Sequence, residues 1–187
     1  SMPTMVGPAN LTEIAYNNAT WLQDLVNGQS YLWTYGSGGG LIENDNGTLM
    51  FNHTDKVMTT GGLTTTSWGG VFNMTYCSYT GDWNTRNNVM RAQLGSGNAL
   101  TTVYAGSPNW WFHPMAMGKS IGHCGLLTMN NVSLYLPQSG SEFNPAPRSH
   151  LGLMGDPALR MLNLSMPSNL VVTNNAGNAA FTWTAAE

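Results

Sequence analysis

The order of apolar and polar positions along the chain predicts helices and strands in a mixed arrangement. Residues 11–27 place apolar side chains at helical spacing, and Gly28 follows as a stop signal. Short apolar and aromatic runs at 30–36, 71–76 and 99–106 are typical of strands, because small or polar residues follow each of them. We therefore expect an amphipathic helix followed by a sheet built from these runs.

Later segments are predicted to be helical. Residues 87–94 have helical spacing, with polar residues before them and Gly95 as a stop after them. Residues 114–130 carry small and apolar residues at helix-like intervals. Within that segment, Gly118 and Gly122 either allow close packing or break the helix.

The order of these elements predicts an α/β fold with a mostly parallel sheet flanked by helices. A strand, a loop, a second strand, a helix and a third strand follow one another between residues 30 and 106. Parallel connections of this kind place the loops that follow the strands at their carboxyl ends. We therefore expect the loops 36–43, 77–84 and 106–114 to lie side by side.

The connection between the first two predicted strands has no sustained period. Residues 41–70 are rich in glycine, asparagine and threonine, which is typical of loops. A short helical turn near Asp55–Met58 is the exception that the pattern indicates. We expect this segment to be dominated by loops.

The C-terminal part predicts a buried strand and then a separate β unit. Residues 150–162 are expected to form a short strand that turns at Gly-Asp-Pro, where Asp156 accepts hydrogen bonds from the amides that follow it. Two alternating runs, 170–173 and 179–183, flank Asn-Asn-Ala-Gly-Asn. They predict a C-terminal β-hairpin or two strands of a sandwich.

Composition narrows the classes of partner. The chain has 187 residues and is 42% hydrophobic, which suits one folded domain and leaves room for a fragment of a second. Only 8% of residues are charged, against about 25% in an average soluble domain, and the net charge is −3 without a basic cluster. This argues against nucleic acid or an anionic membrane surface as a partner, since both need clustered cations. No apolar run is long enough to span a bilayer.

Potential modification and metal sites are sparse. The two cysteines, Cys77 and Cys124, either form one bridge or stay free, and neither belongs to a Cys-x-x-Cys pair. No cluster has the spacing of a zinc site or an EF-hand, so we expect no metal and no cofactor. Several Asn-x-Ser/Thr triplets occur, among them those that begin at Asn10, Asn46, Asn73 and Asn163, and in so Asn- and Thr-rich a chain they are expected by chance.

Several motifs together resemble the gingipain-type (family C25) cysteine peptidases, which have a caspase-like fold. The matching pieces are a strand that ends in a glycine-rich loop, a strand that ends in Cys-x-x-x-Gly-Asp-Trp, the series YAGxPxWxFHPMAMGxxIG and the ending LMGDPALRM. The resemblance covers about residues 28–162. It implies a caspase-like α/β domain over 1–165, possibly partial, in an exported protein. Residues 166–187 are similar to the opening strands of a fibronectin type III module.

By this resemblance, Cys77 stands where the family has its nucleophile, at the carboxyl end of a central strand. The family's general base is a histidine, and the matching position here is Gly38. A thiol with an ordinary pKa near 8.5 is only a few per cent thiolate at pH 7, and a paired histidine is what lowers that pKa. Normal turnover would need another imidazole; His113 is the best surrogate, and His53 is a second one. Alternatively, Cys77 is a small buried core residue.

The loops carry other candidates for binding. If Trp83, Trp110 and Trp111 are exposed, they form a stacking surface for sugars or aromatic side chains; if they are buried, they are loop core. Asp82 is either a carboxylate that caps its loop or part of a calcium site shared with Asn84. Gly38 and its neighbouring glycines match no phosphate-binding motif and favour a tight turn.

Two main functional hypotheses follow. The first is a gingipain-like peptidase homologue that is catalytically impaired because Gly38 replaces the histidine. The second is a non-catalytic module that binds polysaccharide or protein within a larger exported protein at the cell surface or outside the cell. A hydrolase of another kind, with His113 and Asp82, lacks a Gly-x-Ser-x-Gly motif to support it. A peptide or glycan is the expected ligand, and open sheet edges make a homodimer a reasonable expectation.

Overall fold

The computed structural model describes residues 5–12, 29–42, 48–51, 56–63, 65–82, 84–105, 110–130, 151–162 and 168–184. The helix predicted at 11–27 falls almost entirely outside these residues. Within them, the elements follow in the order η1 (Pro8–Asn10), β1 (Tyr31–Ser37), β2 (Gly39–Ile42), β3 (Thr48–Phe51), β4 (Lys56–Thr59), α3 (Thr60–Leu63), β5 (Gly70–Tyr76), α4 (Val89–Leu94), β6 (Thr101–Ala105), η3 (His113–Met117), α5 (Ile121–Asn130), β7 (Leu151–Gly155), β8 (Ser168–Asn175) and β9 (Asn178–Thr184).

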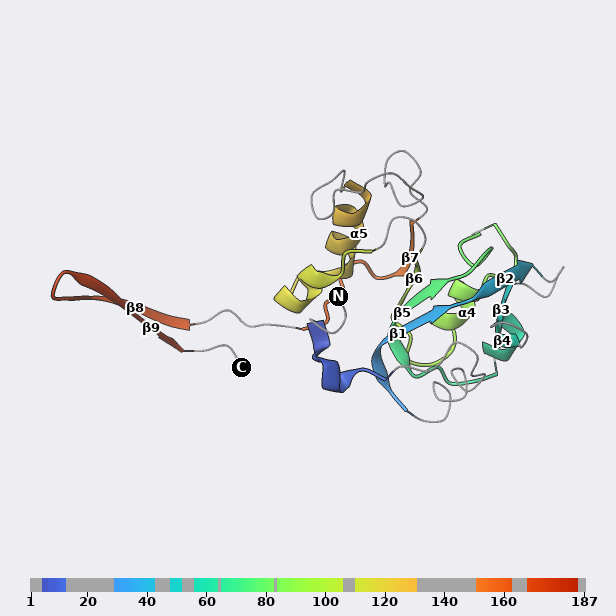
Figure 1. The fold of residues 1–187 in the computed structure, drawn as a ribbon, viewed down its shortest axis with the longest axis horizontal. Helices are drawn as coiled ribbons and strands as arrows, with labels where there is room; N and C mark the ends of the chain where they lie inside the picture. Colours follow the sequence, from blue (N-terminus) through green and yellow to red (C-terminus); the bar gives the residue numbers. More distant parts are fainter. Residues whose placement is uncertain are drawn as a thin grey trace.

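A mostly parallel sheet with the strand order β1-β5-β6-β7 forms the centre of the fold. β1 pairs parallel to β5, and β5 pairs parallel to β6, whereas β7 runs antiparallel to β6. α5 and α4 lie on opposite sides of this sheet (Figure 1). The α/β class, the mostly parallel sheet and its three predicted strands are confirmed, with end shifts of at most two residues.

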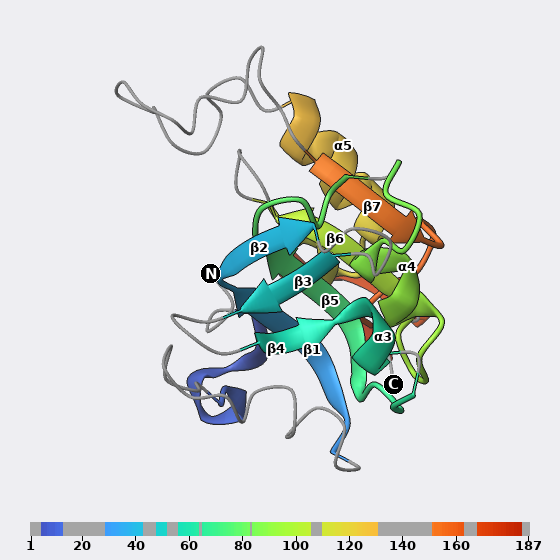
Figure 2. The same ribbon diagram turned by 90° about the vertical axis from the view of Figure 1, so that its right-hand side faces the viewer.

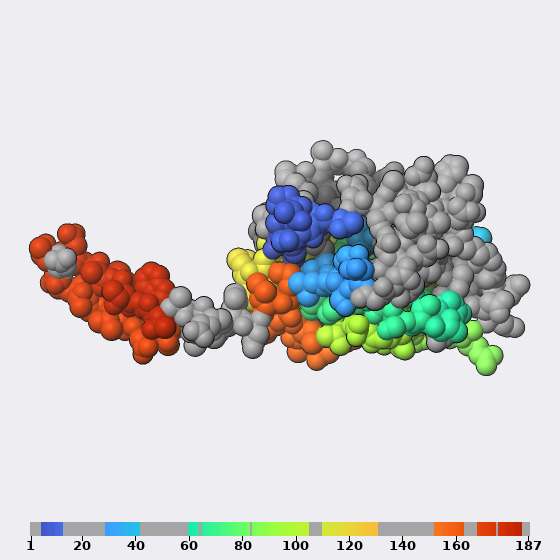
Figure 3. All heavy atoms as spheres, turned by 90° about the horizontal axis from the view of Figure 1, so that it is seen from below, coloured from blue at the N-terminus to red at the C-terminus, as the bar shows by residue number. Residues whose placement is uncertain are grey.

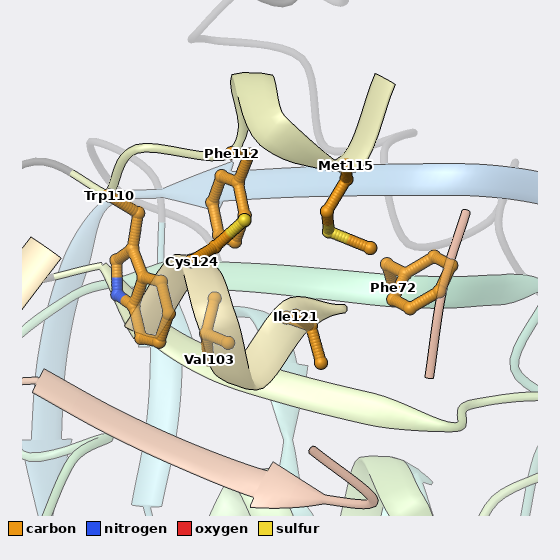
Figure 4. Close-up of a cluster of buried hydrophobic side chains, with 7 residues drawn as sticks. All are labelled: Phe72, Val103, Trp110, Phe112, Met115, Ile121 and Cys124. Atoms are coloured by element: carbon orange, nitrogen blue, oxygen red, sulfur yellow. The ribbon is translucent and has the colours of Figure 1, made fainter. Parts of the chain in front are cut away.

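Apolar side chains pack on both faces of the sheet. On the face toward α4, a cluster forms that we call the α4-side cluster; it contains Leu63, Trp68, Cys77, Val89 and Ala99. On the other face lies the α5-side cluster (Figure 4), with Phe72, Val103, Trp110, Phe112, Met115, Ile121 and Cys124. This division follows from the pleat of the strands, since successive side chains point to opposite faces.

A buried asparagine connects the strands beneath α4. Asn73, in the middle of β5, accepts hydrogen bonds at Oδ1 from Thr34 Oγ1 of β1 and from Trp68 Nε1, both at 2.6 Å. Its Nδ2 donates to the carbonyl oxygens of Gly70 and Thr101, both at 3.1 Å. Asn73 therefore links β1, β5 and β6 and holds the Trp68 ring. Because it is 1% exposed, the triplet that begins there is not an accessible glycosylation site.

The segment predicted to be helical at 114–130 is divided at Gly118. Gly118 adopts a left-handed φ of 76°, and its amide donates to the Met115 carbonyl, so η3 ends there. In α5, Gly122 lies so close to Pro157 that a Cβ at that position would be 2.7 Å from the proline Cβ. Both alternatives are thus found: Gly118 breaks the helix, and Gly122 allows close packing.

The prediction that loops dominate residues 41–70 is wrong. β2, β3 and β4 form an antiparallel sheet in that order. β4 occupies most of the stretch where the pattern indicates a helical turn, and α3 follows it. Figures 1 and 2 show this sheet at the end of the molecule away from α5. Pairing with neighbouring strands overrides the weak strand preference of glycine and asparagine here.

The C-terminal elements agree with the sequence pattern. β7 is followed by Asp156, whose Oδ1 accepts a hydrogen bond from the Ala158 amide at 2.8 Å. β8 and β9 form the predicted hairpin. Its turn has positive φ at Ala176 and Gly177, and Asn174 Oδ1 accepts from the Gly177 amide. The hairpin stands apart from the body (Figures 1 and 3). The domain boundary expected after residue 165 lies outside the described residues.

The hydrogen bonds of Asn73 predict a large effect of its removal. Asn73→Leu has a similar volume but leaves the buried donors of Thr34 and Trp68 without their acceptor, at a cost of roughly 1–3 kcal/mol each. We expect the free energy of unfolding, measured with urea, to fall by about 3 kcal/mol or more. Asn130→Ala, at the exposed end of α5, is the control and should change it by less than about 0.5 kcal/mol. Equal effects of both changes would contradict this role of Asn73.

Candidate functional site

The carboxyl edge of the sheet, where β1, β5 and β6 end, brings the predicted loops together. The Gly38 amide, after β1, donates to the carbonyl oxygen of Tyr76 at the end of β5, at 3.1 Å. A Cβ on Gly40 would overlap the Ser78 carbonyl group. These contacts confirm that the loops 36–43 and 77–84 lie side by side. In the third loop, residues 106–109 are outside the described residues.

The glycine run after β1 is used for close backbone packing. Gly38 pairs with Tyr76, and β2 begins at Gly39, so the run leads directly into the antiparallel sheet. Gly40 lies against the backbone of Ser78, where no side chain fits. The expected close backbone approach is therefore found at Gly40. The expected tight turn is not found, because the chain passes through Gly38 directly from β1 into β2 and none of the glycines 36–40 has a positive φ.

Cys77 lies at the carboxyl end of β5 but belongs to the core. Its side chain is 3% exposed and packs in the α4-side cluster with Trp68 and Val89. Burial raises the pKa of the Cys77 thiol to about 11, although a side-chain hydrogen bond with Thr80 lowers it in part. Thr80 Oγ1 also donates to the Cys77 carbonyl oxygen at 2.8 Å. Cys77 is therefore a protonated thiol at neutral pH, which is the weak form of the nucleophile.

The structure does not bring His113 to Cys77. His113 begins η3, and its ring meets Trp111 edge-on, with a centroid distance of 6.3 Å. Phe112 and Met115, on either side of it, pack in the α5-side cluster, which is separated from Cys77 by the sheet. His123 lies on α5, exposed and also across the sheet from α4. The other two histidines of the chain, His53 and His150, lie outside the described residues.

The predicted tryptophan surface is not formed by Trp110. Its side chain is 8% exposed and stacks on Phe112 at a centroid distance of 5.1 Å. Trp110 Nε1 donates to the carbonyl oxygen of Tyr104 at 2.9 Å, so the ring folds back onto the end of β6. Trp111 is half-buried, and its amide donates to Thr128 Oγ1. Trp110 is thus core, while Trp83 lies outside the described residues.

The loop around Asp82 is fastened by the side chain of Asn88. Asn88 Nδ2 donates to the carbonyl oxygens of Thr80 at 2.8 Å and Asp82 at 3.2 Å. Its Oδ1 accepts from the amides of Met90 and Arg91 and so caps α4. One buried amide thereby joins the loop to the helix. In the part of the chain that the structure describes, no three or more His, Cys, Asp or Glu side chains gather where they could hold a metal ion.

Among the described residues of this edge, the exposed aromatic side chains are tyrosines, which the sequence pattern did not single out. Tyr35, Tyr76 and Tyr79 leave 52%, 42% and 47% of their surface exposed. The ring of Tyr76 lies 6.4 Å from that of Tyr104, on the next strand. The alternation of side chains along β1 and β5 could have indicated from the sequence that Tyr35 and Tyr76 lie on the same face of the sheet. The conformation of Tyr79, with a φ of 66°, has no signature in the pattern of apolar residues.

Comparisons of the chain with models of known protein families, with curated proteins and with solved structures find no match. None of the described helices is both long and apolar enough to cross a membrane.

The packing of Gly40 on Ser78 predicts that replacing this glycine destabilises the protein. Gly40→Ala should lower the free energy of unfolding by about 2 kcal/mol, since the added methyl group forces the two loops apart. Gly61→Ala is the matched control, because a Cβ there meets nothing within 4 Å and α3 gains a better helix former. We expect it to be neutral or stabilising. Urea unfolding checks both, and an unchanged Gly40→Ala protein would contradict the close loop contact.

Burial of Cys77 predicts slow alkylation. At pH 8, iodoacetamide should label Cys77 about 100-fold or more slowly in the folded protein than in urea, because a pKa of about 11 leaves little thiolate. The rate should rise about tenfold per pH unit as the thiol begins to ionise. Mass spectrometry of the two cysteine peptides separates Cys77 from Cys124, whose pKa burial also raises to about 11. Rapid labelling of folded Cys77 at pH 7 would show an activated thiolate instead.

Proposed function

We propose that this chain is a caspase-like domain, related to the gingipain-type cysteine peptidases, that has no peptidase activity and binds polysaccharide or protein at the carboxyl edge of its sheet. The burial of Cys77 is the observation that carries this proposal. A cysteine peptidase needs a thiolate that can reach a substrate carbonyl and a base within about 3 Å of the thiol. Cys77 has a raised pKa, is 3% exposed and lies across the sheet from His113.

The caspase-like part of the proposal rests on where the glycine-rich loop and Cys77 lie in the sheet. The glycine-rich loop follows β1, Cys77 follows β5, and the two strands are parallel neighbours. This is the arrangement that the resemblance implies for the base and the nucleophile. Gly38 occupies the place of the base without its imidazole. Among the residues that the structure describes, neither His113 nor His123 takes over the role of that base at Cys77.

The location outside the cell rests on composition alone. With 8% charged residues and an abundance of asparagine and threonine, the chain has a neutral, hydrogen-bonding character. We propose that it acts as part of an exported protein at the cell surface or in the surrounding medium.

A peptidase assay tests the lack of catalysis. The protein is incubated with a fluorogenic peptide library that covers basic, acidic and apolar residues before the scissile bond, with and without a reducing agent. We expect the same background hydrolysis for the natural sequence, for Cys77→Ala and for Cys124→Ala, because a buried neutral thiol does not attack a carbonyl.

An active cysteine peptidase added to parallel samples is the positive control for the library. Hydrolysis that Cys77→Ala abolishes and Cys124→Ala leaves unchanged would contradict the proposal and identify Cys77 as a nucleophile.

A further inference from the structure

Three exposed tyrosines lie toward the carboxyl edge of the sheet, one in β1, one at the end of β5 and one in the loop after β5. We call Tyr35, Tyr76 and Tyr79 the tyrosine surface; each is between 42% and 52% exposed. Tyr35 is in register with Met74 on the neighbouring strand, and Tyr76 is two residues farther along. Residues two apart on a strand share a face, so Tyr35 and Tyr76 project from the same face of adjacent strands. Tyr79 follows in the loop directly after β5.

Tyr79 is held in a conformation that its side chain does not favour. Its φ of 66° lies in the left-handed region, which bulky residues seldom adopt and which glycine or asparagine adopts more readily. Packing does not offset this strain, since Tyr79 is 47% exposed and belongs to neither core cluster. Strain of this kind concentrates at functional sites. A tyrosine at this position is better explained by what its ring contacts outside the protein.

The tyrosine surface has a firm base. The ring of Tyr76 lies 6.4 Å from the ring of Tyr104, and Tyr104 in turn packs directly against Gly81, where a Cβ would lie 2.9 Å from the ring. The loop that carries Tyr79 is fixed by the hydrogen bonds of Thr80 to Cys77 and of Asn88 to Thr80. A fixed backbone beneath Tyr76 and Tyr79 reduces the conformational entropy that is lost when a ligand stacks on their rings.

The surroundings favour a neutral, hydroxyl-rich ligand. Segments 31–38 and 76–82 carry a single charged side chain, Asp82. Without cations, these segments offer nothing to neutralise an anionic ligand. Ser37 and Ser78 are exposed beside the rings and add hydroxyl groups to those of the tyrosines. A sugar ring matches this combination, because its C–H face packs on an aromatic ring while its hydroxyl groups form hydrogen bonds at the rim.

We propose that the tyrosine surface binds the sugar rings of a neutral polysaccharide by stacking. This inference deepens the proposed function, on which it rests, by naming the residues and the class of ligand. It moves the binding surface from the tryptophans, of which Trp110 is buried, to Tyr35 within β1, Tyr76 at the end of β5 and Tyr79 in the loop that follows.

Affinity electrophoresis and calorimetric titration test the proposal with defined probes. The full chain is tested against hydroxyethylcellulose, mixed-linkage β-glucan, xyloglucan, mannan and soluble starch, with alginate as an anionic probe and a random peptide library as a protein-like one. We expect binding to at least one neutral polysaccharide. Tyr35→Ser and Tyr76→Ser should each weaken it about tenfold, the loss of one stacked ring.

Tyr79→Gly separates a binding role from a structural one. Glycine adopts the left-handed conformation without strain, so we expect this variant to melt at a higher temperature while it binds the polysaccharide about tenfold more weakly. Phe181→Ser and Trp183→Ser are matched controls on the hairpin; these rings are 57% and 58% exposed but lie away from the carboxyl edge. They should leave the affinity unchanged.

The binding measurements distinguish results that support the proposal from results that overturn it. Binding that the tyrosine variants weaken and the hairpin variants do not would support the proposal. Binding to no neutral polysaccharide, binding that all variants share, or binding only to peptides or alginate would each overturn it. None of these outcomes depends on the reactivity of Cys77, so the lack of peptidase activity stands or falls separately in the hydrolysis assay.

Discussion

A polar side chain in the middle of an apolar strand determines how this sheet is held together. Asn73 has no access to water, so its amide must find partners inside the protein or lose roughly 1–3 kcal/mol for each group left unpaired. It finds them on β1, on β6 and on the Trp68 ring. These bonds fix the neighbouring strands in one register, because a shift of one residue would turn Asn73 toward the apolar α5-side cluster. They also fix Trp68, the largest side chain of the α4-side cluster.

The position of Cys77 follows from this arrangement. Successive side chains of β5 point to opposite faces of the sheet, so Asn73 and Thr75 lie on the same face. Cys77, the first residue after β5, continues this alternation and points into the α4-side cluster. The loop then turns back through Thr80, and Asn88 ties it to α4. A thiol enclosed in this way is stabilised as the neutral form, since burial disfavours the thiolate. Cys77 therefore has the chemistry of a core residue, although it directly follows a central strand at the carboxyl edge of the sheet.

The sequence predicted the parts of the fold that depend on local pattern. The runs that became β1, β5 and β6, the stop at Gly95 and the turn at Asp156 each carry their own signal in neighbouring residues. The antiparallel sheet β2-β3-β4 was not predictable, because its segments lack alternation and gain their order from pairing with each other. At the site, the adjacency of two loops was predictable from parallel connections. The sequence left Trp110 open between core and surface; the structure selects the core, because the chain folds back so that the indole bonds to the Tyr104 carbonyl.

Cys77 is enclosed in the core, whereas Tyr35, Tyr76 and Tyr79 stay exposed toward the carboxyl edge of the sheet. The tyrosines stand there on fixed backbone, with hydroxyl groups and few charges around them. The central claim is that Cys77 is a core residue and not a nucleophile. An experimental structure tests it most directly through the distance from Cys77 Sγ to the nearest imidazole nitrogen. We predict a distance above about 6 Å; a nitrogen within about 3.5 Å, in reach of a hydrogen bond, would contradict the account.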